Sequence, residues 1–173
     1  MPVDFPTVAP TLSGSKVTLV QLEISRLEEY VALIGDEETS AWTASSGSFT
    51  IEQLTHWLQT RPGATERLDW AIIENATQEF VGEIVLNEFD ADQQSMNMRI
   101  ALITGKTSRG LGTQALEMVI KFAFESLSLS SLTLEVLKHN ERAIRSYTKC
   151  GFLKTGEITE DGQVFLQMKL SCN

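Results

Sequence analysis

Hydrophobic positions along this chain follow two different periods, and the changes of period divide it into strands and helices. Alternating or continuous apolar runs predict strands over 16–22, 68–74, 80–86, 96–103, 132–137, 152–158 and 164–170. Apolar residues at helical spacing predict helices over 25–34, 50–60, 112–127 and 140–150. The order is therefore β-α-α-β-β-β-α-β-α-β-β, an α/β fold in which four helices flank a mixed, mostly antiparallel central sheet.

Polar and small residues mark the ends of these elements. We expect Ser25 and Thr50 to be N-caps and Gly35 to end the first helix. Residues 36–48 are polar and irregular, and Trp42 within them is a candidate lid residue. Prolines and small polar residues before position 16 predict a flexible tail over 1–15, followed by one folded domain over 16–173.

Composition excludes several classes of function. The formal net charge of −9 argues against nonspecific nucleic-acid binding, which needs a basic surface. No apolar run is long enough for a membrane span and no secretory signal is recognisable, so we expect a cytoplasmic protein with no membrane partner. Cys150 and Cys172 are the two cysteines, and without a Cys/His cluster they predict neither a disulfide framework nor a metal site.

The charge is unevenly distributed along the chain. Residues 1–105 hold 5 Lys/Arg and 16 Asp/Glu, whereas residues 106–173 hold 9 and 7. This division favours a cationic ligand on the first part and an anionic ligand on the second.

A glycine-rich segment joins the strand over 96–103 to the helix over 112–127. Such a turn directs backbone N–H groups and the positive helix end at one place, which is typical of a phosphate site. A P-loop would need glycine at the position of Ile100, so that motif is excluded. A dinucleotide fingerprint fits Gly110, Gly112 and Ala115 with Glu135 on the next strand, and it remains an alternative although residues 104–109 separate the strand from the first glycine.

Two motifs together resemble those of a known family. The glycine segment reads Thr107-Ser-Arg-Gly-Leu-Gly112, and a later segment reads Asn140-Glu-Arg-Ala-Ile-Arg-Ser-Tyr-Thr-Lys-Cys-Gly-Phe152. They resemble the cofactor motifs of the GNAT acetyltransferases, Gln/Arg-x-x-Gly-x-Gly/Ala and Asn-x-x-Ala-x-x-x-Tyr-x-x-x-Gly-Phe, with Thr107 departing from the first position. The resemblance extends over nearly the whole chain. Trp57-Leu58 and the segments 81–83 and 99–102 are similar to the branch that acetylates the N-termini of ribosomal proteins.

The resemblance implies the GNAT fold and acetyl-coenzyme A (acetyl-CoA) as the cosubstrate, with transfer of the acetyl group to a primary amine. It implies that the pyrophosphate is cradled by the backbone amides of Arg109, Gly110, Leu111, Gly112 and Thr113. It also implies that the pantetheine arm pairs with the strand end at Ala101, Leu102 and Ile103, whose amides would stabilise the oxyanion. Asn140 would hydrogen-bond the arm, and Ala143 would allow close packing against it.

The same resemblance makes Tyr147 the candidate general acid that protonates the leaving thiolate, with Ser146 as an alternative contact to the thiol. Many members of the family carry an acidic base in the strand before the glycine loop, but the strand over 96–103 has none. The candidate bases lie elsewhere: Glu83 and Glu88 first, then His56 and His139, with a chain of waters as a further option.

The acceptor follows from the charge distribution. We expect a cationic amine: a protein N-terminus first, then a small polyamine, then an amino-sugar antibiotic. A protein N-terminus leads because its pKa of about 8 leaves a neutral fraction without a strong base. The non-enzymatic alternative is a GNAT-fold module that binds acyl-CoA without turnover, and either reading is compatible with a monomer or a homodimer.

Overall fold

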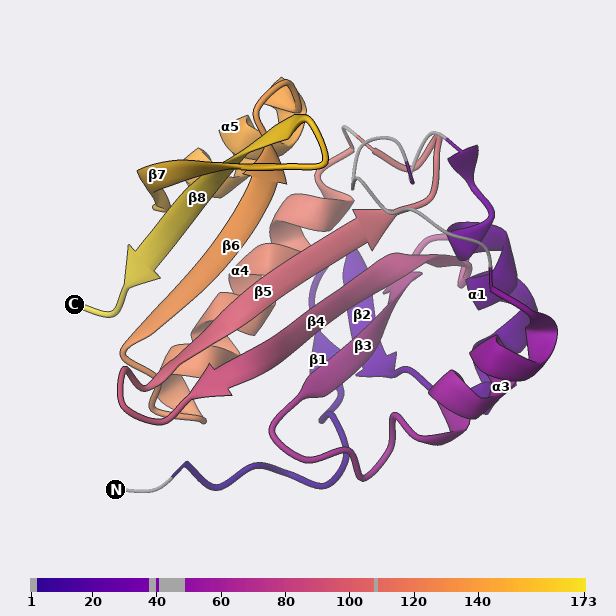
Figure 1. The fold of residues 1–173 in the computed structure, drawn as a ribbon. Coiled ribbons are helices and arrows are strands. Elements are labelled where there is room, and N and C mark those ends of the chain that lie inside the picture. The colour runs from indigo at the N-terminus through magenta and orange to yellow at the C-terminus, as the bar shows by residue number, and fades with distance from the viewer. Residues whose placement is uncertain (1–2, 38–39, 41–48, 108) are drawn as a thin grey trace.

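A single mixed sheet with helices on both faces forms the protein (Figure 1). The computed structural model describes residues 3–37, 40, 49–107 and 109–173. Within these residues the sheet has eight strands in the order β1-β2-β3-β4-β5-β6-β8-β7. The strands are β1 (Leu12–Ser13), β2 (Val17–Gln21), β3 (Leu68–Glu74), β4 (Phe80–Asp90), β5 (Ser95–Leu102), β6 (Ser131–Leu137), β7 (Leu153–Glu160) and β8 (Gln163–Ser171). The helices are η1 (Ile24–Arg26), α1 (Leu27–Ile34), α3 (Ile51–Gln59), α4 (Leu111–Glu125) and α5 (Glu141–Lys149).

The element order expected from the sequence is confirmed, with the short β1 as an addition. Every neighbouring pair of strands is antiparallel except β5 and β6, which run parallel. The sheet is therefore mixed and mostly antiparallel, as the hydrophobic pattern predicted.

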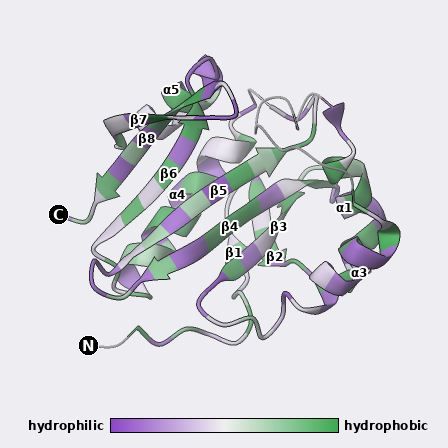
Figure 2. Cartoon of the chain, in the orientation of Figure 1, coloured by the Kyte–Doolittle hydropathy of each residue, from purple (hydrophilic) through white to green (hydrophobic). Residues whose placement is uncertain are grey.

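Two hydrophobic cores lie on opposite faces of the sheet. Residues of α4 and α5, among them Leu116, Val119 and Tyr147, belong to the larger core. Residues of α1 and α3, among them Leu33 and Leu58, form the smaller core. Figure 2 shows hydrophobic and hydrophilic residues alternating along β6, as expected for a strand with one buried face. The two cores fix the central strands from both sides.

The segment before residue 16 differs from the expected flexible tail. Its described residues pack on the sheet: Ala9 is 3% exposed, and Leu12 and Ser13 pair with β2. Trp70 Nε1 donates a hydrogen bond of 2.8 Å to the carbonyl of Pro10. Proline and small polar residues disfavour helix, but they do not prevent an extended segment from docking on an existing sheet.

One expected helix cap is wrong and another is confirmed. The first helix begins at Leu27 after the 3-10 turn η1, and the Ser25 hydroxyl donates to Glu23 rather than capping the helix. Gly35 ends α1 as expected. Thr50 caps α3 in a capping box, because its hydroxyl accepts from the Gln53 amide and the Gln53 side chain accepts from the Thr50 amide.

The parallel pair β5 and β6 separates partway along its length. Their ladder runs from Ser95↔Ser131 to Asn97↔Thr133, whereas β5 continues to Leu102 and β6 to Leu137. The end of β5 remains paired with β4 on its other edge, through Gly82↔Leu102. The sheet thus opens into a V between β5 and β6. No helix among the described residues is long and apolar enough to cross a membrane.

Replacing Thr50 by Ala should lower the free energy of unfolding by about 1 kcal/mol, because the Gln53 amide loses its acceptor at the start of α3. Urea denaturation of the full chain measures this difference. Thr50→Asp is the matched control, since a carboxylate at the N-cap accepts the same hydrogen bond. An equal loss in both variants would contradict the capping role.

Candidate active site

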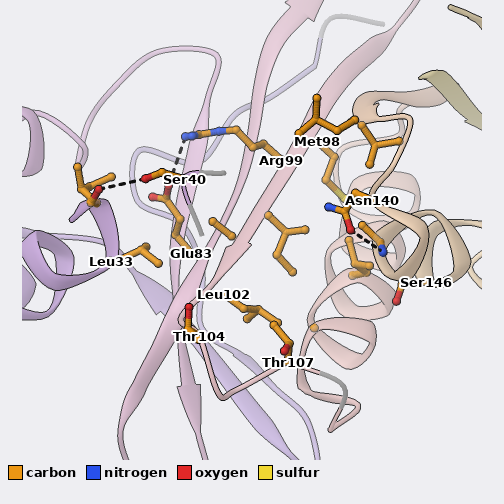
Figure 3. Close-up of a pocket in the computed structure, with 18 of the residues that line it drawn as sticks. Leu33, Ser40, Glu83, Met98, Arg99, Leu102, Thr104, Thr107, Asn140 and Ser146 are labelled. Atoms are coloured by element: carbon orange, nitrogen blue, oxygen red, sulfur yellow. Dashed lines mark hydrogen bonds and ion pairs between the residues drawn. The ribbon is translucent and has the colours of Figure 1, made fainter. Parts of the chain in front are cut away.

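A cavity of about 810 Å³ lies in the V between β5 and β6 (Figure 3). Its walls come from α1, α3, β4 and β5 on one side and from the glycine loop, α4, β6 and α5 on the other. The C-terminal ends of the two separated strands line it, with Met98 to Leu102 from β5 and Glu135 to Leu137 from β6. An extended ligand that carries amides can enter such a gap and bind in the manner of an added strand.

The glycine loop brings the start of α4 to this cavity. Gly110 is the N-cap of α4 with a φ of 79°, the left-handed conformation that glycine adopts at little cost, and among the described residues no side chain caps the helix. The first amides of a helix have no intrahelical acceptor, and Gly110, Gly112 and Thr113 line the cavity. A Cβ on Gly112 would lie 3.0 Å from Leu102 Cδ1, so a larger residue would fill the space between α4 and β5. The arrangement suits an anionic group such as a phosphate.

Helix α5 supplies three further groups to the same cavity. Asn140 caps the helix by accepting from the Ala143 amide at 3.3 Å, and both residues line the cavity. Tyr147 lies further along α5, is 8% exposed and packs edge-on against Phe152 with ring centroids 6.1 Å apart. Burial, with a smaller contribution from Cys150, raises the pKa of Tyr147 to about 12. Its hydroxyl therefore keeps its proton at physiological pH.

Glu83 is a buried carboxylate on the opposite wall. It is 2% exposed, and its Oε1 lies 3.5 Å from Nη2 of Arg99 on β5. Its Oε2 has no hydrogen-bond partner among the described residues. Burial raises the pKa of Glu83, although the charge of Arg99 opposes this shift. A carboxylate with one unsatisfied oxygen beside a cavity can accept a proton or bind an ammonium group.

An aromatic and cationic stack supports this wall. The Arg61 guanidinium lies 3.4 Å from the ring centroid of Trp57, and that of Arg67 lies at 4.9 Å. Arg67 donates two hydrogen bonds of 2.9 Å to the buried carboxylate of Asp69. Burial and then the charge of Glu83 raise the pKa of Tyr30, which lines the cavity together with Trp57. These interactions hold the side chains of this wall in defined positions.

The structure brings most of the expected site residues to one cavity: Glu83, Ala101, Leu102, Gly110, Gly112, Thr113, Asn140, Ala143, Ser146 and Tyr147. Three others do not line it. The Ile103 amide donates to the Val81 carbonyl at 2.8 Å, Leu111 is 5% exposed in the core, and Arg109 forms an ion pair with Glu74. Of the remaining candidate bases, His56 lines the cavity, whereas Glu88 and His139 do not.

Sequence reasoning missed Tyr30 and Arg99. Arg99 alternates with Met98 and Ile100 along β5, so its polar character was visible, but its contact with Glu83 depends on the register of β4 and β5. Tyr30 lies among apolar residues of α1, and its spacing in the sequence does not distinguish it from them. Trp42, the expected lid residue, lies outside the described residues. Those residues contain no group of three or more His, Cys, Asp or Glu side chains arranged to hold a metal ion.

Comparison with known proteins identifies the family. A family model for the acetyltransferase (GNAT) domain matches residues 16–153. The chain therefore belongs to the GNAT acetyltransferase family, and the expected fold class is confirmed.

Particular relatives include bacterial spermidine N(1)-acetyltransferases. The protein from Vibrio cholerae is 23% identical over 90 residues, 52% of this chain and 52% of the relative. That from Escherichia coli K12 is 31% identical over 83 residues, 48% of this chain and 45% of the relative. The matched segment thus spans about half the length of these relatives.

Solved structures extend the likeness to nearly the whole chain. A Vibrio cholerae spermidine N-acetyltransferase in complex with CoA and spermine has a TM-score of 0.83 at 18% identity, covering 91% of this chain and 96% of that one. A Vibrio cholerae protein provisionally assigned as a ribosomal-protein-serine acetyltransferase has a TM-score of 0.79 at 20% identity, covering 99% and 100%. At these identities the likeness establishes the fold.

Glu83→Gln should stabilise the protein relative to wild type increasingly as the pH rises above about 4.3, the ordinary pKa of an unfolded Glu. In this range the folded chain retains a proton at Glu83 that the unfolded chain loses, so the contribution of Glu83 to stability falls with rising pH, and the variant lacks this contribution. Urea denaturation at pH 4, 6 and 8 measures the difference. Glu88→Gln, an exposed position on the same strand, is the control. A difference between Glu83→Gln and wild type that is constant over this pH range would contradict the burial of the charge.

Proposed function

We propose that this protein is an N-acetyltransferase that moves an acetyl group from acetyl-CoA to the primary amine of a small cationic acceptor. One observation carries the proposal: a gap between strands, a helix start with glycine at its N-cap, a protonated Tyr147 and a buried Glu83 all meet at one cavity. Each is a common structural feature alone. Together they could bind, in that order, the pantetheine arm of CoA, its phosphates, the leaving thiolate and the acceptor amine.

The cofactor half of the cavity is complementary to coenzyme A. Backbone amides from Arg109 to Thr113 would bind the pyrophosphate, as their position at the start of α4 supports. The ends of β5 and β6 would accept the amides of the pantetheine arm. Ile103 is the weakest member of the expected set, because its amide already donates to Val81. The small side chain of Ala143 leaves room for the arm beside α5.

The transfer forms a bond between the amine nitrogen and the thioester carbonyl carbon, and the carbon–sulfur bond breaks. Tyr147 would donate to the departing thiolate. With a pKa of about 12, complete transfer of its proton to a thiolate whose acid has a pKa of about 8.5 would cost about 5 kcal/mol. We therefore assign Tyr147 a strong hydrogen bond that stabilises the developing charge, with proton transfer completed as the thiol leaves the site. Ser146 is less suited, since its hydroxyl donates to the Arg142 carbonyl at 3.3 Å.

Glu83 would take the proton that the amine must lose. Its raised pKa makes it a stronger base than an exposed carboxylate, and its buried Oε2 has no hydrogen-bond partner among the described residues. The charge distribution supports a cationic acceptor, because 16 of the 23 acidic residues precede position 106. Because the relatives include spermidine acetyltransferases, we expect a linear polyamine to be a better acceptor than a protein N-terminus.

Calorimetry on the full chain should show binding of CoA and no response to NAD(H). Release of free CoA from acetyl-CoA should then be fastest with spermidine in a panel that also contains peptides with free N-termini and an aminoglycoside. Because salt screens attraction between an acidic entrance and a polycation, KM for spermidine should rise with ionic strength. NAD binding without CoA binding would overturn the assignment, and CoA binding without turnover would indicate a non-catalytic acyl-CoA module. If the best acceptor were neutral, the prediction of a cationic acceptor would be wrong, and the assignment as an acetyltransferase would stand.

Tyr147→Phe should lower kcat by about 10- to 1,000-fold, because it removes the hydroxyl that stabilises the thiolate and keeps the ring that packs on Phe152. Steady-state kinetics with a thiol reagent for free CoA measures the effect, and circular dichroism checks the fold. Ser146→Ala on the same helix is the matched control and should retain most of the activity. Unchanged turnover in Tyr147→Phe would remove Tyr147 from catalysis.

A further inference from the structure

A buried carboxylate binds the glycine loop from outside the cavity. Glu74, the last residue of β3, accepts a hydrogen bond of 3.3 Å from Lys106 and forms an ion pair of 3.0 Å with Arg109. The two cations come from either side of Thr107, a residue that lines the cavity. Glu79 also binds Lys106, at 3.0 Å, from the turn between β3 and β4.

Glu74 is much more firmly held than its partners. Its side chain is 3% exposed, against 24% for Lys106 and 49% for Arg109. Its backbone amide donates to the Glu79 carbonyl, and the residue pairs with Val17 of β2. Burial alone would raise the pKa of Glu74, but hydrogen bonds from Lys106 and Thr77 and the charge of Arg109 outweigh it and lower the pKa. The carboxylate is therefore ionised and fixed to the sheet.

The glycine loop needs an anchor of this kind. Of its described residues, 103–107 and 109–110 belong to no helix or strand. Both Gly105 and Gly110 have positive φ angles, of 89° and 79°, so the loop takes a shape that few sequences specify locally. When neighbouring groups already hold a binding loop in its productive geometry, ligand binding does not lose free energy to ordering the loop.

We propose that Glu74 is a positioning residue that holds the glycine loop in its cofactor-binding shape by pairing with Lys106 and Arg109. This inference rests on the proposed binding of CoA at that loop. Lys106 and Arg109 then pair with Glu74, and the CoA phosphates are bound by backbone amides at the start of α4.

The rival account makes opposite predictions. If Lys106 and Arg109 left Glu74 to bind the phosphates directly, Glu74 would compete with the cofactor for them. Removing its charge would then tighten CoA binding. If instead Glu74 holds the loop in place (the clamp), removing the charge of Glu74 weakens CoA binding.

Glu74→Gln should raise the Kd of CoA about tenfold, because two ion pairs are replaced by weaker contacts between a cation and a neutral amide. KM for acetyl-CoA should rise in parallel while kcat changes less than twofold. Hydrogen exchange at the Lys106 and Arg109 amides, followed by NMR without ligand, should be faster than in wild type. Glu79→Gln is the matched control: the Glu79 side chain is 60% exposed and its carboxylate pairs with Lys106, so its effect on Kd should be less than threefold.

Arg109→Met keeps the test decisive if Glu74→Gln does not fold, because Arg109 is half exposed. If Glu74 positions the loop through this ion pair, Arg109→Met should show a higher Kd for CoA and faster amide exchange in the ligand-free protein. Tighter binding or an unchanged Kd in Glu74→Gln, or a higher Kd with unchanged exchange in Arg109→Met, would overturn it. A wild-type protein that does not bind CoA would instead refute the proposed function, and the ligand-free exchange would still test the clamp.

Discussion

The separation of β5 from β6 is the constraint on which the rest of the structure depends. Three pairs of residues, from Ser95↔Ser131 to Asn97↔Thr133, join two otherwise antiparallel halves of the sheet. Strands left apart in the middle of a sheet expose backbone groups that need partners from elsewhere. The opening is held by packing on both sides: α4 and α5 share one core with β6, and α1 and α3 share another with β3 and β4. The sheet can therefore remain open without collapsing.

The two walls of the opening differ in their chemistry. On the side of α4 and α5, the polar residues at the cavity include Thr113, Asn140, Arg142, Ser146 and Tyr147, and β6 adds Glu135. On the side of β4, the cavity is lined by the buried carboxylate of Glu83, whose pKa is raised by burial although the charge of Arg99 opposes the shift. An oligoanionic ligand and an amine can thus approach one cavity from different sides. A thioester held in the gap between the strands would lie between them.

The sequence indicated the local features and left the long-range contacts undetermined. Strand periodicity, the Thr50 N-cap and the two cofactor motifs depend on residues close in the chain, and each could be predicted. The tail before residue 16 was misjudged, because its composition gives no sign that Trp70 binds the Pro10 carbonyl. Likewise, Glu83 could be proposed as a base from the lack of an acidic residue in β5, but its neighbour Arg99 follows only from the pairing of β4 with β5.

The glycine loop illustrates the same limit most clearly. Its motif predicts a phosphate site from six consecutive residues, yet carboxylates distant in the chain hold it in place. Asp36, after α1, accepts hydrogen bonds from the Thr104 amide at 3.0 Å and hydroxyl at 2.8 Å, while Glu74 binds Lys106 and Arg109. Asp36 lies two residues after the end of α1, whose residues Tyr30, Leu33 and Ile34 line the cavity. Its hydrogen bonds with Thr104 therefore link the glycine loop to the opposite wall of the cavity.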